Sequence, residues 1–214
     1  MNKYEMILFD LDGTLWDSAG NVAESWNVVL DRWLGMHPEL SLTHFSAEDI
    51  HGVMGKPMSE IKEILLGYLP QDIKDAIADE CMTYEVDYIA EHGGELFPEV
   101  TETLKALKDK GYLLAIVSNC QTGYIGAFLK SMKTSEYFCD FEEWGNTGRP
   151  KGENISLVME RNNISKAIYV GDTTGDMTAA HSAGLPFVHA AYGFGTADDA
   201  EYVIHAFAEL LELF

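Results

Sequence analysis

The stretch ILFDLDGTLWDS, residues 7–18, decides the fold. An apolar run from Met6 to Phe9 ends at Asp10 and is closed by Gly13. A short apolar run that ends at a glycine turn predicts a buried strand, and such strands belong to parallel sheets that are covered by helices on both faces. Ligands bind beyond the carboxyl ends of these strands. The sequence therefore predicts that Asp10 and Asp12 lie where an α/β fold carries out its chemistry.

Asp10 and Asp12 are two residues apart, so their side chains point to the same side of an extended segment. Two ionised carboxylates at close range repel each other, and a divalent cation is the simplest way to offset that repulsion. Oxygen ligands that include one or two carboxylates suit Mg²⁺. One Asp can then attack phosphorus while the other donates a proton to the leaving group. The alternative is a solvated turn, because Asp and Gly are common in turns.

The composition is that of a globular protein with one core, or with a core and a small second domain. The chain has 214 residues, of which 47% are hydrophobic and 23% are charged. Its 35 acidic and 14 basic side chains give a formal net charge of −21. This charge argues against nucleic acid or an anionic membrane as a partner, because both require basic patches, and it is also typical of a highly soluble protein. A phosphorylated substrate is an anion as well, so its site requires a metal ion and a local Lys or Arg.

The three cysteines, Cys81, Cys120 and Cys139, form an odd and sparse set without metal-ligand spacing. Such a set is typical of a reducing compartment, and each cysteine is expected to be a small buried residue. The N-terminal residues lead directly into the first strand without a secretory signal, and no apolar run has the length of a membrane span. We therefore expect a cytoplasmic protein, whose oligomeric state the sequence leaves open.

Between residues 17 and 92 apolar residues recur at helical spacing. Asp17 or Ser18 is the expected N-cap of the first helix, Pro57 lies in the first turn of the second, and the third ends near Gly93. Their apolar stripes are, in order, Val22, Trp26, Val29 and Trp33; Met58, Ile61, Leu65 and Tyr68; and Ile73, Ile77, Cys81, Tyr84 and Tyr88. The pattern predicts an all-helical insert after the first strand, over residues 17–93.

From residue 94 onward, predicted strands and helices alternate, which indicates a doubly wound parallel sheet. The predicted helices span 98–110, 122–132, 153–162 and 174–183, and the predicted strands span 112–117, 137–141, 167–170, 186–191 and 202–204, before a C-terminal helix. The predicted architecture is an α/β protein with a Rossmann-like core, residues 1–16 and 94–214, and the helical insert as a second domain.

Polar residues follow the predicted strands of this core. Ser118 and Asn119 end one strand and open a helix, where a hydroxyl and backbone N–H groups make a phosphate site or an ordinary helix cap. Asp172 follows the strand predicted over 167–170. Lys151 lies just before a predicted helix, where a compact positive charge can hold phosphoryl oxygens or can simply be a surface lysine.

The segment Asp-x-Asp-Gly-Thr-x-x-Asp-Ser, residues 10–18, resembles the first motif of the haloacid dehalogenase superfamily of phosphohydrolases. Residues 114–119 resemble the second motif, and the segment Gly-Asp-x-x-x-Asp, residues 171–176, resembles the fourth. For the third motif, a lysine, we favour Lys151, with Arg149 as the alternative. The insert takes the place of the family's first type of cap, as in phosphoglycolate-phosphatase-like and phosphoglucomutase-like members.

The resemblance implies phosphoryl transfer through an aspartyl phosphate. Asp10 would attack phosphorus, and Asp12 would protonate the leaving oxygen and then deprotonate water. Mg²⁺ would be held by an Asp10 oxygen, the Asp12 backbone carbonyl and Asp172, with Asp176 either binding it through water or acting as a first-turn acid favoured by the helix dipole. The phosphoryl oxygens would be bound by Ser118, Asn119 and Lys151.

These features together predict a Mg²⁺-dependent phosphatase that acts on a small phosphorylated metabolite, such as phosphoglycolate or a sugar phosphate. Dehalogenases of the family lack an Asp at the position of Asp12. Related mutases carry a His about where Val22 stands, so a hydrolase is favoured over a mutase; a catalytically silent phosphometabolite binder is the further alternative. His51, Lys56 and residues 52–55 are candidates for contact with the substrate, although Gly55-Lys56-Pro57 is also a simple turn before a helix.

Overall fold

The computed structural model describes residues 3–214, and its centre is a six-stranded parallel sheet. The sheet order is β5-β4-β1-β6-β7-β8, which is 3-2-1-4-5-6 when the six strands are numbered along the chain. This order is that of a doubly wound Rossmann-like sheet, so the predicted fold class is confirmed. The strands are β1 (Met6–Phe9), β4 (Leu113–Ser118), β5 (Asp140–Glu143), β6 (Ala167–Gly171), β7 (Phe187–Ala190) and β8 (Tyr202–Ile204).

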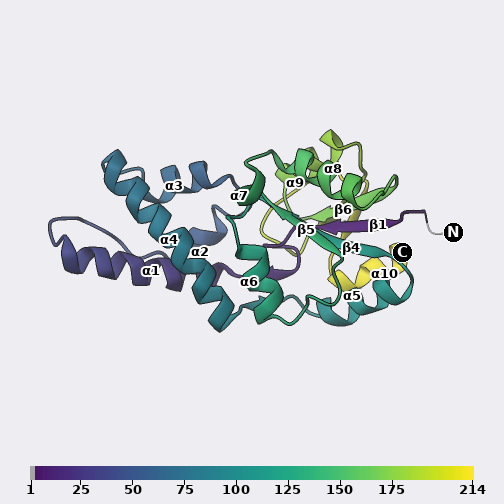
Figure 1. Ribbon diagram of the computed structural model, residues 1–214, viewed down its shortest axis with the longest axis horizontal. Coiled ribbons are helices and arrows are strands. Elements are labelled where there is room, and N and C mark those ends of the chain that lie inside the picture. The colour runs from purple at the N-terminus through teal and green to yellow at the C-terminus, as the bar shows by residue number, and fades with distance from the viewer. Residues whose placement is uncertain (1–2) are drawn as a thin grey trace.

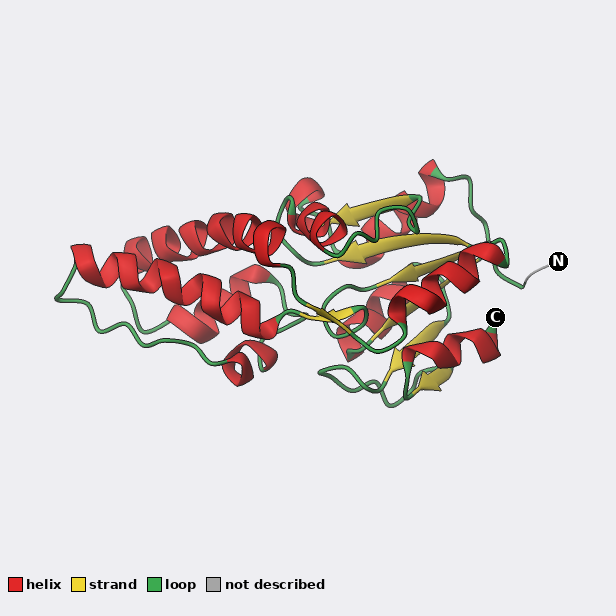
Figure 2. Ribbon diagram, turned by 90° about the horizontal axis from the view of Figure 1, so that it is seen from below, coloured by secondary structure: helices red, strands yellow, loops and turns green. Residues whose placement is uncertain are grey.

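Helices cover both faces of this sheet, because side chains alternate between the faces along each buried strand. In β1, Met6 and Leu8 pack into the cluster that includes Ile155 and Val158, whereas Ile7 and Phe9 pack into the larger cluster on the opposite face. The first face is covered by α8 (Lys151–Arg161) and α9 (Thr174–Ser182), and the second by α5 (Val100–Asp109), α6 (Tyr124–Ser131) and α10 (Leu210–Leu213). The layers are visible in Figure 2.

Most predicted elements of the core agree with the structure to within two residues at each end. The strand predicted over 137–141 is the exception, since β5 begins only at Asp140. The aromatic residues Tyr137 and Phe138 favoured a strand there, but they lie in the turn before β5 and pack against the larger hydrophobic cluster. Helix α8 begins at Lys151, two residues earlier than predicted, because Pro150 is its N-cap.

Between β2 (Trp16–Asp17) and β3 (Glu95–Leu96) the chain forms four helices. They are α1 (Ala19–Met36), α2 (Ala47–His51), α3 (Met58–Leu66) and α4 (Gln71–His92). In Figure 1 they extend from the side of the sheet toward which β1 points. β2 and β3 pair as a short antiparallel ribbon, which the sequence did not predict because two residues are too few to show a period. The short helix α7 (Trp144–Thr147) follows β5.

The apolar stripes of the insert are only partly those predicted. Along α4, Ile77 and Cys81 are buried as expected, but the stripe then continues through Glu85 and Ile89. The carboxylate at position 85 interrupts the hydrophobic pattern, and the tyrosines predicted in its place, Tyr84 and Tyr88, are half-buried. Tyr68, predicted to extend the stripe of α3, lies beyond that helix and is 57% exposed.

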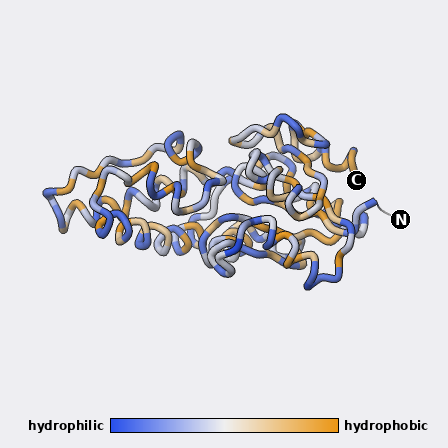
Figure 3. Tube along the Cα trace, turned by 90° about the horizontal axis from the view of Figure 1, so that it is seen from above, coloured by the Kyte–Doolittle hydropathy of each residue, from blue (hydrophilic) through white to orange (hydrophobic). Residues whose placement is uncertain are grey.

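The cysteines and the hydropathy pattern add two observations. Cys81 and Cys120 are buried as expected, whereas Cys139 is exposed, because it lies in the turn before β5. In the range 3–214, no helix has both the length and the apolar composition that crossing a membrane requires. Figure 3 shows hydrophobic and hydrophilic residues alternating along the helices of the insert, as in helices that pack on one face only.

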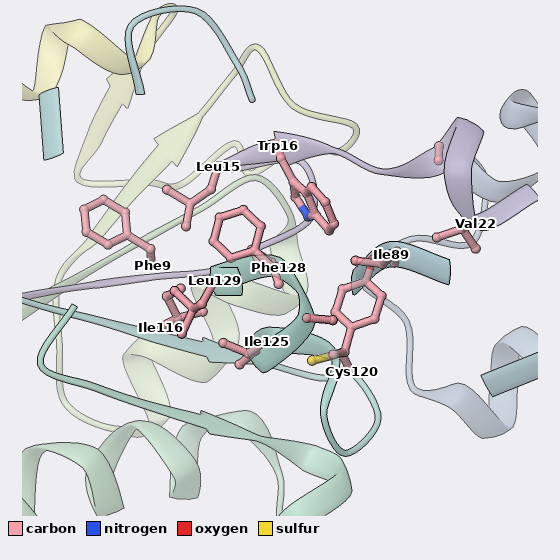
Figure 4. Packing of buried hydrophobic residues seen from close by; sticks show 14 of the residues in the cluster. Phe9, Leu15, Trp16, Val22, Ile89, Ile116, Cys120, Ile125, Phe128 and Leu129 are labelled. Carbon is pink, nitrogen blue, oxygen red and sulfur yellow. The ribbon is translucent and has the colours of Figure 1, made fainter. Parts of the chain in front are cut away.

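Trp16 joins the core to the insert. Its side chain is fully buried and meets the Phe128 ring edge-on, with the ring centroids 4.9 Å apart. Figure 4 shows Trp16 between core residues such as Phe9 and insert residues such as Val22. Position 94 opposite the indole is a glycine, and a Cβ there would lie 2.6 Å from two ring atoms of Trp16. One continuous hydrophobic cluster therefore extends through the β2–β3 ribbon.

Replacing Phe128 by Ala tests how much this junction stabilises the fold. We expect the free energy of unfolding to fall by about 3–5 kcal/mol, because a fully buried ring is lost and leaves a cavity under Trp16. Urea denaturation measures this change. The exposed aromatic Tyr68 provides the matched control, since Tyr68→Ala is expected to change stability by less than about 0.5 kcal/mol. Equal effects of the two changes would contradict the central place given to Phe128.

Candidate active site

The register of the sheet places three of the proposed site residues side by side. Phe9 pairs with Ile116 on one side and with Val170 on the other, so the segments that follow leave the sheet at the same edge. The residues concerned are Asp10, Ser118 and Asp172, all of which are buried. Chain order reverses at β1, and a ligand site is expected at that switch point of a doubly wound sheet.

Lys151 lies between two of the buried acids. Its Nζ donates to Asp10 Oδ1 at 2.9 Å and to Asp176 Oδ1 at 2.5 Å, and only 5% of the lysine side chain is exposed. The first residue of α8 thus carries its charge to the end of β1. Arg149, the alternative for this position, is exposed and makes neither contact. The structure therefore brings Lys151, and not Arg149, to Asp10.

Three carboxylates gather around this lysine. Asp10, Asp172 and Asp176 each offer an oxygen atom, and the three oxygens lie within 4.8 Å of one another. Asp172 Oδ2 accepts a hydrogen bond from the Phe194 N–H at 2.8 Å, while its Oδ1 is buried without a hydrogen-bond partner. A buried carboxylate oxygen that lacks a donor calls for a cation or water. A set of hard oxygen ligands fits Mg²⁺.

Glycines allow the loops to close on Asp172. Gly13 has a φ of +79°, and a Cβ there would lie 2.3 Å from Asp172 Oδ2. A Cβ on Gly193, in the loop after β7, would lie 2.4 Å from the Cβ of Asp172. Any side chain at either position would displace the carboxylate, so the glycine of the first motif is required by the close approach to Asp172 as well as by its backbone conformation.

Asp12 stands apart from the three-carboxylate cluster. Its Oδ1 accepts hydrogen bonds from Trp16 Nε1 at 2.9 Å, Ser18 Oγ at 2.5 Å and Tyr124 OH at 2.9 Å. Ser18, one of the two expected N-cap residues, is the N-cap of α1, but its side chain makes no capping hydrogen bond; the carboxylate of the other candidate, Asp17, accepts a hydrogen bond from the Ala19 N–H at 3.0 Å. The three donors hold Asp12 in a fixed orientation.

Asp176 is the first-turn acid of α9 and also belongs to the carboxylate cluster. Its Oδ2 accepts hydrogen bonds from the backbone N–H of Thr173 at 3.0 Å and from its hydroxyl at 2.7 Å, in a reciprocal capping box at the start of α9. Its Oδ1 accepts from Lys151. One oxygen therefore serves the helix end, and the other lies in the cluster.

Burial and mutual repulsion dominate the electrostatics of the cluster. Burial, reinforced by the charge of Asp176, raises the pKa of Asp10 to about 7. Burial and the charges of Asp176 and Asp10 raise the pKa of Asp172 to about 8. Burial also raises the pKa of Asp12. For Lys151 burial acts to lower the pKa, but Asp10 and Asp176 together raise it above its usual range.

A small pocket lies between this site and the insert. The space in it that water-sized groups can enter is about 50 Å³. Asp10, Asp12, Ser118 and Asn119 line it from the core, and the insert contributes Lys56 together with apolar side chains. Four further residues that were not predicted as site residues also line the pocket, namely Trp26, Glu85, Gln121 and Tyr124.

The other predicted substrate contact, His51, does not line this pocket. Its Nε2 lies 3.1 Å from Asp17 Oδ1, and its ring lies 4.5 Å from that of Phe194, centroid to centroid. Asn119 Nδ2 lies 3.5 Å from the Gly55 carbonyl oxygen. These contacts join the insert to the loops around the site.

The pH dependence of stability tests the electrostatics of Asp172. Its pKa is raised from about 4 in the unfolded chain to about 8, so the contribution of Asp172 to the stability of the metal-free protein is greatest below about pH 4 and is lost as the pH rises through about 8. Asp172→Asn is therefore expected to stabilise the chelator-treated protein by about 1–3 kcal/mol at pH 8, but not at pH 4. Thermal unfolding across this range measures the difference, and the exposed Asp87→Asn is the control. Parallel pH profiles for wild type and Asp172→Asn would contradict the assignment.

Comparison with known proteins agrees with this geometry. Residues 7–190 match the family model described as haloacid dehalogenase-like hydrolase. The chain is 30% identical to the phosphoglycolate phosphatase of Escherichia coli K12 and 31% identical to that of Salmonella typhi, in each case over 91% of this chain and 85% of the relative.

Solved structures show the same fold. A haloacid dehalogenase-like hydrolase from Bacteroides fragilis superposes with a TM-score of 0.81 at 27% identity, covering 97% of this chain and 100% of that one. A predicted phosphoglycolate phosphatase from Haemophilus somnus gives a TM-score of 0.84 at 24% identity, covering 100% and 99%. With its fold, its buried acids and these relatives, the chain belongs to the haloacid dehalogenase-like hydrolases and is a phosphatase.

Proposed function

We propose that the protein is a Mg²⁺-dependent phosphatase that hydrolyses a small phosphate ester, of the phosphoglycolate or sugar-phosphate type, through an aspartyl phosphate on Asp10. The observation that carries the proposal is the position of Asp10. Its buried carboxylate lies at the switch point of the sheet, lines the pocket, and contacts Lys151 at 2.9 Å. The proposed nucleophile Asp10 thus lies next to the positive charge of Lys151 and at the wall of the pocket.

In the proposed reaction an Asp10 oxygen forms a bond to phosphorus as the bond from phosphorus to the leaving oxygen breaks. Asp12 gives its proton to that leaving oxygen. The raised pKa of Asp12 favours the protonated form needed for this step, and its three hydrogen-bond donors orient it. In the second half the oxygen of a water molecule forms a bond to phosphorus as the bond from Asp10 to phosphorus breaks, and Asp12 takes a proton from that water. Inorganic phosphate is released, and Asp10 and Asp12 are restored.

The remaining site residues bind the phosphoryl group and the metal ion. We assign the phosphoryl oxygens to Ser118, Asn119 and Lys151, with Asp176 positioning the lysine. The cation would be held by a carboxylate oxygen of Asp10, by the Asp12 backbone carbonyl and by Asp172, whose Oδ1 has no other partner. When bound, Mg²⁺ neutralises the negative charge that develops on the transferring phosphoryl group.

Residues 17–93 act in this proposal as a cap over a catalytic core formed by residues 1–16 and 94–214. The cap covers the pocket, excludes water and selects the leaving group. Val22 lines the pocket about where related mutases carry a His. Its presence supports hydrolysis over transfer of the phosphoryl group to a second hydroxyl. The unpaired cysteines support an assignment to the cytoplasm.

Asp10→Asn tests the nucleophile. Phosphate release from a panel of sugar and organic-acid phosphates is expected to require Mg²⁺, to stop with chelator, and to fall at least about a thousandfold in the variant, because an amide oxygen is a poor nucleophile. Asp87→Asn, on the exposed side of α4, controls for the loss of one negative charge. Metal-dependent turnover that survives Asp10→Asn would exclude Asp10 as the nucleophile.

Asp12→Asn tests the proton donor. A nitrophenolate leaves without a proton, whereas an alkoxide needs one, so the variant is expected to lose much more activity on an alkyl phosphate than on 4-nitrophenyl phosphate. We expect the two losses to differ by about a hundredfold or more, from the usual contribution of general acid catalysis. Comparison of kcat/KM for both esters in wild type and variant measures this. Equal losses on the two esters would indicate a purely structural role.

A further inference from the structure

Glu85 is a buried acid that the proposed reaction does not use. It lies on α4 of the insert, is 4% exposed and lines the pocket that also contains Asp10 and Asp12. Its Oε2 accepts a hydrogen bond from the Trp26 indole N–H, and its Oε1 accepts one from Gln121 Nε2 at 3.0 Å. Two neutral donors therefore hold the carboxylate in place, one from the insert and one from the core.

The chain offers a natural comparison on the same two helices. Trp33 and Glu80 repeat the indole–carboxylate contact at 2.9 Å, but there the carboxylate is 37% exposed and is also 3.6 Å from Arg32. Among residues 3–214, no such cation acts on Glu85: its pKa is influenced by its burial and by Trp26, Gln121 and Asp12. A carboxylate without a cationic partner is costly to bury, so its retention at the pocket calls for an explanation.

The small pocket places Glu85 beside the proposed position of the leaving group. In the proposed function the phosphoryl group lies at Asp10 and Ser118, and the leaving group extends toward the insert. The free space there is about 50 Å³, the volume of a few water molecules. Apart from the exposed Lys56, the charged side chains that line the pocket within residues 3–214 are the acids Asp10, Asp12 and Glu85.

We infer that Glu85 selects the leaving group: it accepts a hydrogen bond from a hydroxyl or ammonium group of the ester and repels a carboxylate at the same place. The inference rests on the proposed function and narrows its substrate class to phosphate esters of small hydroxylated or amine-bearing alcohols. A carboxylate would approach a buried acid whose own hydrogen-bond partners are neutral, and like charges repel more strongly at a buried group than in water. The relatives named phosphoglycolate phosphatases have a substrate with such a carboxylate, so this chain is expected to differ from them in specificity.

Three phosphate esters, each with a two-carbon leaving group, test the inference. They are 2-phosphoglycolate, 2-hydroxyethyl phosphate and 2-aminoethyl phosphate, which differ only in ending in a carboxylate, a hydroxyl or an ammonium group. Burial raises the pKa of Glu85 to about 7, so the assays are run at about pH 8, where it is ionised. We expect kcat/KM for the hydroxyl and ammonium esters to exceed that for 2-phosphoglycolate by at least about tenfold, or 1.4 kcal/mol. Separate values for these two esters show which donor Glu85 prefers.

Glu85→Gln is expected to remove most of this discrimination. The substitution keeps the volume and removes the charge, and the Gln121 amide can turn to present its oxygen to the new side-chain N–H₂. The ratio of kcat/KM between the carboxylate and ammonium esters should shift toward the carboxylate ester by about tenfold or more. Glu80→Gln, which alters the matching Trp–Glu pair away from the pocket, is the control and should leave the ratio as in wild type.

Binding separates this inference from the proposed function. In the Asp10→Asn background, calorimetry with Mg²⁺ present gives Kd for the three esters without turnover. The same order in Kd supports selection by Glu85. If that order holds but wild type hydrolyses none of the esters, the proposed function is contradicted and the inference stands. Metal-dependent hydrolysis with 2-phosphoglycolate as the best of the three esters would overturn the inference and leave the phosphatase intact. A folded Glu85→Gln protein with unchanged ratios would overturn it as well, and the order in wild type tests it without any variant.

Discussion

The main constraint on this structure is the free-energy cost of burying several carboxylates close together. Asp10, Asp172 and Asp176 bring three carboxylates together, and Lys151 supplies one positive charge between two of them. One cation cannot balance three anions, and burial together with this imbalance raises the pKa values of Asp10 and Asp172. The site is therefore unstable by itself and becomes balanced only when a further cation or protons enter it. The rigid sheet beneath it is what keeps the acids from moving apart.

The surrounding elements all serve to hold this arrangement. The parallel register of β1 with β4 and β6 fixes the positions of Asp10, Ser118 and Asp172, and two glycines allow the loops to reach Asp172. Asp176 is secured by the capping box of α9, and Lys151 by its place at the start of α8 behind Pro150. Backbone geometry thus determines most of the positions of the site residues, and contacts restrict the orientations of their side chains.

The sequence predicted this part of the molecule well for a physical reason. Each site residue follows a short apolar run or opens a helix, so its position is determined by local patterns that a single sequence displays. Lys151 could be preferred over Arg149, although only the structure shows which of them reaches Asp10. The roles given to these residues remain predictions, since they concern chemistry and not position.

What the sequence could not show depends on contacts between distant segments. Glu85 breaks the apolar stripe of α4, and it was passed over in favour of Tyr84 and Tyr88 because its partners, Trp26 and Gln121, lie 59 and 36 residues away. A charged residue four positions after one buried residue and four before another, as between Cys81 and Ile89, is the signal that would have identified it. Tyr124 was not predicted for the same reason, since the Asp12 carboxylate to which it donates is 112 residues away in the sequence.

The β2–β3 ribbon has a consequence for how such a protein can change over time. The chain leaves the core at Trp16 and re-enters it at Glu95, and these two crossings lie beside each other in one antiparallel pair. The four helices between them add no strand to the main sheet and interrupt none of its pairings. A segment inserted at adjacent points can be lengthened, shortened or exchanged while the register of the sheet stays the same. If the insert selects the substrate, as proposed, the residues that set substrate range and those that carry out the reaction lie largely in separate segments of the chain, and each segment can change without altering the other.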